Sequence, residues 1–408
     1  MNIVKTPTKR QEIIQEAFKV WGENSFYNTS LASLAQSMNI SKAALYRHIK
    51  GKEDLLEAMK EYFLQLHRHL CQEVQQKAAG KGFDEKLSIF HKVVIQFYAK
   101  NYWYYRFIFI HMASQSEESL DSFKELKQFQ KELFPLEELH TEFGWDTKEL
   151  VLVQNYILNS GIFLLFHSSM SQFSFEKLKK SDLKNLNKSI VTEGFAGQER
   201  LNEIDFQRIE DQCWLDSCEL PETDRIFSAI AQVVGEVGLW EASLEKIAGK
   251  AGISKSSLYF YFKNRNDMIW EMIDRERHSL GQLFLQKSGI YESFEERLYA
   301  YFVVFSSYMW ARSNILEVMN WFRFQGFKIE VPANCTDTMV RYVQFLNDGQ
   351  ELDKLRKDLF GPQMIIQWIN QFLIQEIHNI NGNKLLTKES NEMLRTLYRL
   401  FLFGVKGE

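Results

Sequence analysis

The sequence predicts an all-α protein built from two tandem copies of one helical unit. The 408-residue chain is 45% hydrophobic but holds only 5 Pro and 20 Gly, so long helices meet few helix breakers. The stretch ISKAALYRHIKGKEDLL (40–56) returns as ISKSSLYFYFKNRNDMI (253–269) without a gap. A chain of this length also exceeds one ordinary domain, so we expect at least two hydrophobic cores.

The first helix of each copy carries the same apolar stripe. Aligning the chain with itself extends the repeat over 12–59 and 225–272, where nearly a third of the positions are identical. The stripe has the spacing i, i+1, i+4, i+5, i+8 of one helix face. Its members are Ile13, Ile14, Ala17, Phe18 and Trp21, and then Ile226, Phe227, Ile230, Ala231 and Val234. FDEKL at Phe83 and FEERL at Phe294 continue the duplication further along the chain.

Two short helices joined by a turn follow in each copy. Ser30 and Ser41 precede them and are favourable N-caps, because a serine hydroxyl can accept a hydrogen bond from an unpaired first-turn N–H. Their counterparts are Ser243 and Ser254. The turn holds Asn39 in one copy and Gly252 in the other, residue types that tolerate a left-handed backbone. This helix-turn-helix geometry lays its second helix in a DNA major groove.

Local charge favours a DNA partner, although the net charge of −4 does not. Residues 24–52 contain no Asp or Glu and carry Lys42, Arg47, Lys50 and Lys52. Residues 246–266 contain none either and carry Lys246, Lys250, Lys255, Lys263 and Arg265. Basic residues beside a groove-sized helix release phosphate counterions, while polar residues on the helix are left to read bases.

Both segments resemble the N-terminal DNA-binding domain of TetR-type transcriptional repressors over about 50 residues. The family pattern runs roughly T/S-x-x-x-I/L-A-x-x-x-G-I/V-S-x-x-x-L-Y-x-H/Y-F-x-x-K-x-x-L. The first copy matches at Ser30, Leu34, Ala35, Ile40, Ser41, Leu45, Tyr46, His48, Lys52 and Leu55. The second matches at Ser243, Ile247, Ala248, Gly252, Ile253, Ser254, Leu258, Tyr259, Tyr261 and Phe262. The departures from the pattern are Asn39, Ile49, Arg265 and Met268.

The resemblance implies two tandem TetR-like units that form an intrachain pseudo-dimer, because family members usually act as homodimers. Each unit would join an N-terminal three-helix helix-turn-helix DNA-binding domain to a helical ligand and dimerisation domain. The predicted domains are 1–60 (DNA-binding domain 1), 61–200 (regulatory domain 1), 201–221 (linker), 222–275 (DNA-binding domain 2) and 276–408 (regulatory domain 2). A further homodimer of whole chains stays open.

The predicted DNA-contacting residues lie in and around the two second helices. In the first copy they are Ser30, Ser41, Lys42, Ala43, Tyr46, Arg47, His48, Lys50 and Lys52. In the second copy they are Ser243, Ser254, Lys255, Ser256, Tyr259, Phe260, Tyr261, Lys263 and Arg265. The alternatives are packing for the tyrosines and ordinary solvated charge for the lysines. We expect Leu45, Leu258, Ile49 and Phe262 to be core residues. The two helix-turn-helix domains, called head 1 and head 2 below, differ in these residues. A non-palindromic operator is therefore expected.

Aromatic stretches in both halves are expected to be mostly core. They are NYWYYRFIFIHM from Asn101 and SYMWARSNILEVMNWFRF from Ser307. The alternative is a pocket for a small apolar or aromatic effector, since small-molecule sites are mainly apolar with a few polar groups. The candidate pocket residues are Tyr102, Trp103, Phe107, His111, Trp310 and Trp321.

The apolar stretch 150–166 falls short of the roughly 20 residues that a bilayer requires, so no membrane partner is expected. Polar residues interrupt it at Gln154, Asn155, Asn159 and Ser160. Together with 364–378, it would suit the helical bundle that joins subunits in the TetR family. Here the bundle would join the two halves of one chain.

No enzyme, metal or cofactor is expected, because the chain has no P-loop, no Gly-x-Ser-x-Gly, no HExxH and no GxGxxG. Four cysteines without a CxxC pair are typical of reduced thiols. The N-terminus lacks the apolar core of a secretory signal, so a cytoplasmic location is expected. We therefore expect a sequence-specific DNA-binding transcriptional regulator, a ligand-responsive repressor. The alternative is a helical sensor or interaction protein in which one or both heads are degenerate.

Overall fold

The computed structural model describes residues 7–24, 29–107, 124–125, 128–168, 180–323, 343–381 and 388–407. Within these ranges the chain forms helices and no β-strand, apart from one isolated bridge between Ala196 and Leu355. The all-α prediction is confirmed. The chain divides into two compact units, Met1–Pro135 and Leu136–Glu408. Among the described helices, none is long and apolar enough to cross a membrane.

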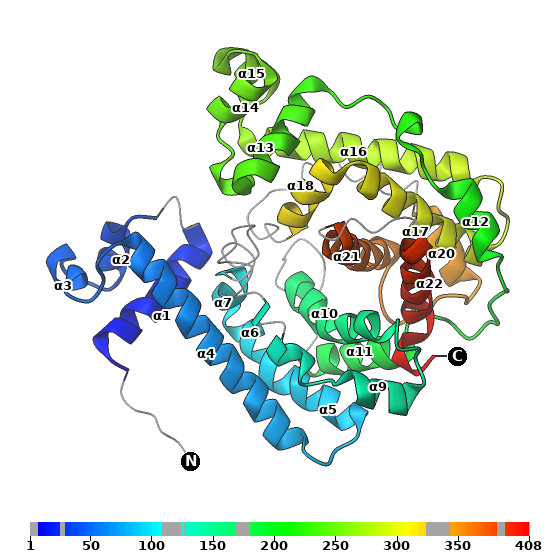
Figure 1. Ribbon diagram of the computed structural model, residues 1–408, viewed down its shortest axis with the longest axis horizontal. Helices are drawn as coiled ribbons and strands as arrows, with labels where there is room; N and C mark the ends of the chain where they lie inside the picture. Colours follow the sequence, from blue (N-terminus) through cyan, green and yellow to red (C-terminus); the bar gives the residue numbers. More distant parts are fainter. Residues whose placement is uncertain are drawn as a thin grey trace. The chain divides into compact units, whose positions relative to one another are not determined.

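The first unit begins with a three-helix head. Its elements are α1 (Lys9–Asn24), α2 (Leu31–Ser37), α3 (Lys42–Tyr46), α4 (Lys52–Ala78), α5 (Phe83–Phe90), the π-helical segment η1 (His91–Ile95), α6 (Gln96–Lys100) and α7 (Tyr102–Phe107). The apolar stripe predicted on α1 is buried in full. In Figure 1 α1, α2 and α3 gather around the N-terminal end of α4. The rest of α4 packs on α5 and η1.

The second unit holds the end of the first copy and all of the second. Its elements from the first copy are α9 (Leu136–Phe143), α10 (Leu150–Ser168) and α11 (Lys180–Glu193). The elements that follow are α12 (Phe206–Cys213), η4 (Ser217–Glu219), α13 (Arg225–Glu241), α14 (Leu244–Ala251), α15 (Lys255–Tyr261), α16 (Arg265–Ser288), α17 (Phe294–Ala311), α18 (Ser313–Arg323), α20 (Gln344–Glu351), α21 (Pro362–Asn381), α22 (Lys388–Phe403) and η5 (Gly404–Lys406). Figure 1 shows α13, α14 and α15 around the N-terminal end of α16, as in the first copy.

The duplication extends beyond the heads to the next long helix. Residues 83–100 and 294–311 have the same length, but the first run is interrupted by η1, whereas α17 is a regular 18-residue helix. Both runs end at residues with nearly the same backbone conformation. Asn101 has φ −130° and ψ 51°, and Arg312 has φ −120° and ψ 60°. The two copies therefore correspond through this helix end as well.

Helices from both copies pack together inside the second unit. Helix α10 contacts α11, α21 and α22, and α22 contacts α11 and α21. The side chain of Trp368 on α21 is fully buried, and its ring centroid lies 4.5 Å from that of Phe163 on α10. Asn155 of α10 donates to Glu376 of α21 at 3.1 Å. This bundle is the place where the two copies share a core.

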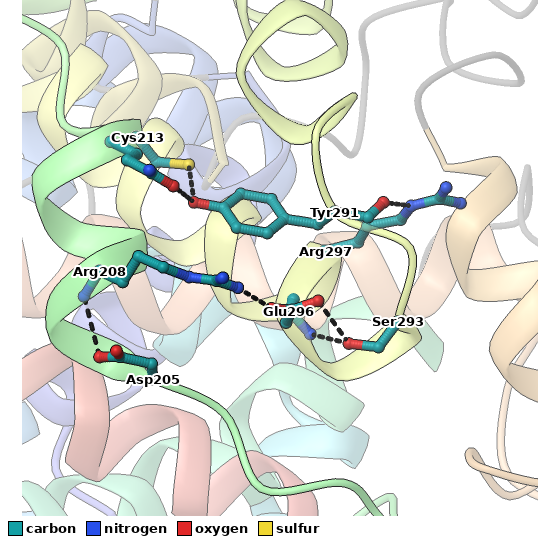
Figure 2. Close-up of polar contacts among 8 residues, drawn as sticks. Asp205, Arg208, Cys213, Tyr291, Ser293, Glu296 and Arg297 are labelled. Carbon is teal, nitrogen blue, oxygen red and sulfur yellow. Dashed lines mark hydrogen bonds and ion pairs between the residues drawn. The ribbon is translucent and has the colours of Figure 1, made fainter.

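The segment between the two copies is folded onto the second copy through α12 (Figure 2). The Asp205 carboxylate caps α12, and Arg208 forms an ion pair with Glu296 at the start of α17. The Tyr291 hydroxyl donates to Gln212 at 2.8 Å and lies 3.7 Å from the Cys213 thiol. These contacts fall in and beside the predicted linker 201–221. The domain boundaries given above stay predictions.

Candidate nucleic-acid interface

The four predicted N-cap serines all cap helices. Ser41 Oγ accepts from the Ala44 N–H at 3.1 Å at the start of α3, and Ser254 Oγ accepts from the Ser257 N–H at 3.0 Å at the start of α15. Ser30 and Ser243 cap α2 and α14 in the same way. These bonds satisfy N–H groups that would otherwise lack an intrahelical partner. Whether the four hydroxyls also contact DNA stays a prediction.

The corner between the two short helices has the predicted left-handed backbone in both copies. Asn39 has φ 52° and Gly252 has φ 65°. In each copy the following isoleucine N–H donates to an alanine carbonyl near the end of the preceding helix, at 3.0 Å. The local sequence therefore builds the same corner twice, once with asparagine and once with glycine.

Each second helix has one buried side and one exposed side. The predicted core residues Leu45, Ile49, Leu258 and Phe262 are buried. Exposed residues stand at positions i, i+1, i+4 and i+5 in both copies, which lie on one helix face, and Ser257 is exposed as well in the second copy. They are Lys42, Ala43 and Tyr46 of α3 with its C-cap Arg47, and Lys255, Ser256, Tyr259 and Phe260 of α15. We name these two sets reading face 1 and reading face 2.

A carboxylate closes the loop after each reading face. The backbone N–H of Lys50 donates to Asp54 at 2.7 Å, and that of Lys263 donates to Asp267 at 3.0 Å. Both lysines are exposed beside the reading faces. Sequence reasoning missed the two aspartates, although their identity in the aligned copies was a usable signal. They orient the loop whose lysines we expect to meet phosphate.

The first head adds an arginine to this loop. Arg10 of α1 forms an ion pair with Asp54 at 3.0 Å and also donates to the His48 carbonyl. The Arg10 side chain, followed by the Lys50 N–H, lowers the pKa of the Asp54 carboxyl. The aligned residue of the second copy is Thr223, so no signal in the repeat pointed to Arg10.

The charge around reading face 2 differs from the prediction based on acid-free windows. Glu245 stands one residue outside the window 246–266, yet the fold brings it onto Lys255 as a salt bridge. This hydrogen bond raises the pKa of the Lys255 ammonium and lowers that of the Glu245 carboxyl. The residue aligned with Glu245 in the first copy is Ala32, which cannot form such a pair. The two heads therefore present unlike electrostatics.

The remaining predicted DNA-contacting residues divide by exposure. His48 and Lys52 are half-buried, and burial lowers the pKa of the Lys52 ammonium. The side chains of Tyr261 and Arg265 lie outside the described part of the chain.

The candidate pocket residues are only partly described. Tyr102, Trp103 and Trp310 are half-buried, and Phe107 is buried. His111 and the side chain of Trp321 lie outside the described residues. Tyr102, Trp103 and Phe107 all lie on the short helix α7. That these residues line a pocket stays a prediction.

Each head is joined to its own regulatory helices. In the first unit the Phe18 ring on α1 lies 4.5 Å from Tyr104 and 4.9 Å from Phe107 of α7, centroid to centroid. In the second unit Ile315 and Val318 of α18 belong to the hydrophobic core that also holds α13, α14, α15 and α16. A displacement of α7 or α18 would therefore disturb the first helix of the corresponding head.

The family model described as bacterial regulatory proteins, tetR family, matches residues 13–59 and again residues 226–272. The two heads are TetR-type DNA-binding domains, in two tandem copies. The HTH-type transcriptional regulator BetI of Proteus mirabilis (strain HI4320) is 23% identical to it over 184 residues, covering 41% of this chain and 89% of BetI. YerO of Bacillus subtilis (strain 168), an uncharacterized HTH-type transcriptional regulator, is 30% identical over 79 residues. That match covers 19% of this chain and 27% of the length of YerO.

Two solved structures are similar to part of this chain. FadR from Bacillus subtilis, in complex with stearoyl-CoA, shares 16% identity over 44% of this chain and 96% of its own, with a TM-score of 0.35. PfmR from Thermus thermophilus, a TetR family transcriptional regulator, shares 20% identity over 44% of this chain and 95% of its own, also with a TM-score of 0.35.

Proposed function

We propose that this protein is a TetR-type regulator that binds double-stranded DNA through both heads of one chain, on an operator with two unlike half-sites. The observation that carries the proposal is that both copies build the same capped helix-turn-helix while their reading faces differ. Arg47 of reading face 1 is replaced by Phe260 on reading face 2, and Ala43 is replaced by Ser256. Two identical heads would favour a palindrome, whereas two unlike heads favour an asymmetric site.

The shared bundle supports a pseudo-dimer within one chain. Helices α10 and α11 of the first copy pack on α21 and α22 of the second, as the equivalent helices of two subunits would. Further contacts join the same parts, since Trp145 Nε1 donates to the Val405 carbonyl at 2.7 Å and Thr396 donates to Glu149 at 2.9 Å. One chain per operator is therefore the expected stoichiometry.

An effector in the helical parts would release the operator, making the protein a ligand-responsive repressor. The support is the packing of α7 on α1, where Tyr104 and Phe107 contact Phe18. An apolar molecule seated beside Tyr102 and Trp103 would shift α7 and with it the first head. The coupling requires only that the effector binds the released state better than the DNA-bound state. Titration with the apolar fluorophore 1-aminoanthracene, read both by dye fluorescence and by operator affinity, tests this step.

A second candidate function is favoured by the chemistry of head 2. Lys255 is paired with Glu245, and an aromatic side chain stands where head 1 has an arginine. These features fit a protein in which only the first head binds DNA and the second serves as an interaction module. The double variant Lys255→Glu with Lys263→Glu separates the two candidates. The matched control in head 1 is Lys42→Glu with Lys50→Glu.

The experiment that tests the proposal is selection of binding sites from random duplex DNA at a stated salt concentration. Two active heads predict enrichment of a site with two distinct half-sites, and both double variants should lose affinity for it. Enrichment of a single half-site, with the head 2 variant unaffected, would establish the second candidate instead. Recovery of a perfect palindrome would contradict unlike heads.

A further inference from the structure

Phe260 is the most exposed large apolar side chain of reading face 2. Its exposed fraction is 86%, against 50% for Tyr259 beside it on the same face. The buried residue of this helix turn is Leu258, so the fold already has its apolar anchor and leaves Phe260 pointing to solvent. An exposed phenylalanine forgoes most of the free energy that burial would provide. Its neighbour Tyr259 makes the apolar area a pair of rings and not an isolated side chain.

The lysine of reading face 2 is held by an acid of the preceding helix. Lys255 pairs with Glu245 of α14 and lies 6.0 Å from the centroid of the Tyr259 ring. The C-terminal part of the face, Tyr259 and Phe260, is therefore apolar, and the exposed Lys263 follows the C-cap residue of the helix. In a major groove the two rings would lie against base edges, and Lys263 would lie near the phosphate backbone.

Reading face 1 has a cation at the same position. Arg47 is exposed at the C-cap of α3, and Tyr46 beside it is 52% exposed, much like Tyr259. In the major groove arginine pairs with the O6 and N7 acceptors of guanine, whereas phenylalanine contacts the 5-methyl group of thymine. The serine N-caps and the corners of the two heads match, and although α3 ends at Tyr46, its C-cap Arg47 keeps a helical backbone with φ −67° and ψ −23°. The Arg47 and Phe260 side chains therefore leave equivalent positions of the two second helices.

We propose that Phe260 reads a thymine methyl group in one half-site, at the position where Arg47 reads a guanine in the other. The inference rests on the proposed function and deepens it, because it names the base chemistry that makes the operator asymmetric. The shared residues Tyr46 and Tyr259 would contact backbone or sugar in both half-sites and carry no discrimination between them.

The test uses the full-length protein and its selected operator. Each thymine is replaced in turn by uracil, which removes only the 5-methyl group, and each guanine by 7-deazaguanine, which removes only the N7 acceptor. Loss of one buried methyl group should weaken binding about fourfold at one thymine position. The Phe260→Ala variant should bind the thymine and uracil operators equally well. The Arg47→Ala variant serves as the matched control, since it should keep the thymine effect and lose the 7-deazaguanine effect.

The outcomes separate the two claims. If the protein selects an operator but uracil at every position leaves affinity unchanged, Phe260 does not read thymine and the inference is overturned. It is equally overturned if Phe260→Ala, with an unchanged circular dichroism spectrum, still distinguishes thymine from uracil. If no DNA is selected at all, the proposed function fails before this question arises.

Discussion

The same pair of helices is held together by different chemistry in the two copies. In the first unit the Tyr98 hydroxyl at the end of α6 is hydrogen-bonded to His67 Nδ1 of α4 at 2.6 Å. In the second unit the Tyr308 hydroxyl at the end of α17 donates to Glu276 Oε2 of α16, also at 2.6 Å. Both helices place a tyrosine near their ends, but one position apart in the alignment, since Tyr98 corresponds to Met309 and Tyr308 to Phe97. The partner on the preceding long helix differs as well.

The cluster in the first unit is neutral. Burial lowers the pKa of His67 to about 3 and raises the pKa of the Cys71 thiol to about 12. The Cys71 Sγ lies 3.4 Å from His67 Nε2, so both ring nitrogens face protein atoms. Asn101, which ends α6, donates from its side-chain amide to the Phe97 carbonyl of the same helix at 2.9 Å.

The cluster in the second unit is ionic. Arg312, the counterpart of Asn101, lies 3.3 Å from Glu276, and less than a tenth of each side chain is exposed. Arg312 also donates to the Pro221 carbonyl and the Thr223 hydroxyl, in the segment that enters head 2. The second copy therefore adds a buried ion pair to the apolar contacts of Ile315 and Val318, where the first copy has aromatic packing between α1 and α7. Divergence after duplication has reached the connection between heads and regulatory helices as well as the reading faces.

The largest effect should come from breaking the ionic cluster. Glu276→Gln leaves the Arg312 guanidinium buried without its counter-charge, and we expect a loss of about 3–5 kcal/mol in the free energy of unfolding. Urea titration of the full chain measures it. The double variant Glu276→Gln with Arg312→Met should recover most of the loss, because no unpaired charge stays buried. A single variant as stable as the parent would show that the pair is not desolvated.

The next-largest effect is a pH dependence of stability that we expect from the His67 cluster of the first unit. His67 has a pKa of about 3 in the fold, below its usual 6.5, so only the unfolded chain takes up the proton as pH falls. The stability that the fold draws from keeping this ring neutral is fully present above pH 6.5 and is lost as the pH falls toward 3. Lowering the pH from 8 to 5 should therefore reduce the free energy of unfolding by about 2 kcal/mol through His67.

The variant that checks the pH effect is His67→Gln, which keeps an amide to bond the Tyr98 hydroxyl but cannot titrate. Its unfolding free energy should fall less than that of the parent between pH 8 and pH 5, and the two proteins should run parallel above pH 7. Identical slopes over the whole range would mean that His67 is accessible to protons in the fold.

A smaller effect distinguishes the two helix-turn-helix corners. Gly252→Ala places a side chain at φ 65° and should cost about 1–2 kcal/mol. Gly252→Asn should cost less, because the first copy already uses Asn39 at φ 52°. The added Cβ would lie 2.5 Å from the Arg225 guanidinium, a flexible side-chain end that can move aside. Thermal unfolding of the two variants orders them, and an alanine variant as stable as the parent would contradict the argument.

The parts of the structure that sequence reasoning predicted are those set by neighbouring residues. The serine caps, the Asn39 and Gly252 corners and the stripe on α1 follow from residues within about two helical turns of one another. The Glu245–Lys255 salt bridge and the Arg312 cluster depend on helix packing, which no periodicity reveals. The π-helical segment η1 has no signature in FDEKLSIFHKVVI that differs from an ordinary helix. The predicted DNA-contacting residues and effector pocket stay predictions.

The measurement that tests the central claim most directly compares three operators at one salt concentration. They are the selected asymmetric site and the two palindromes built by doubling each of its half-sites. Two unlike heads on one chain predict that the asymmetric site binds tighter than either palindrome by at least about tenfold, with one chain per duplex, since each mismatched base pair costs about 1–3 kcal/mol. Equal affinity for one of the palindromes, with two chains bound, would mean that a single kind of head reads DNA and that the account of the second head is wrong.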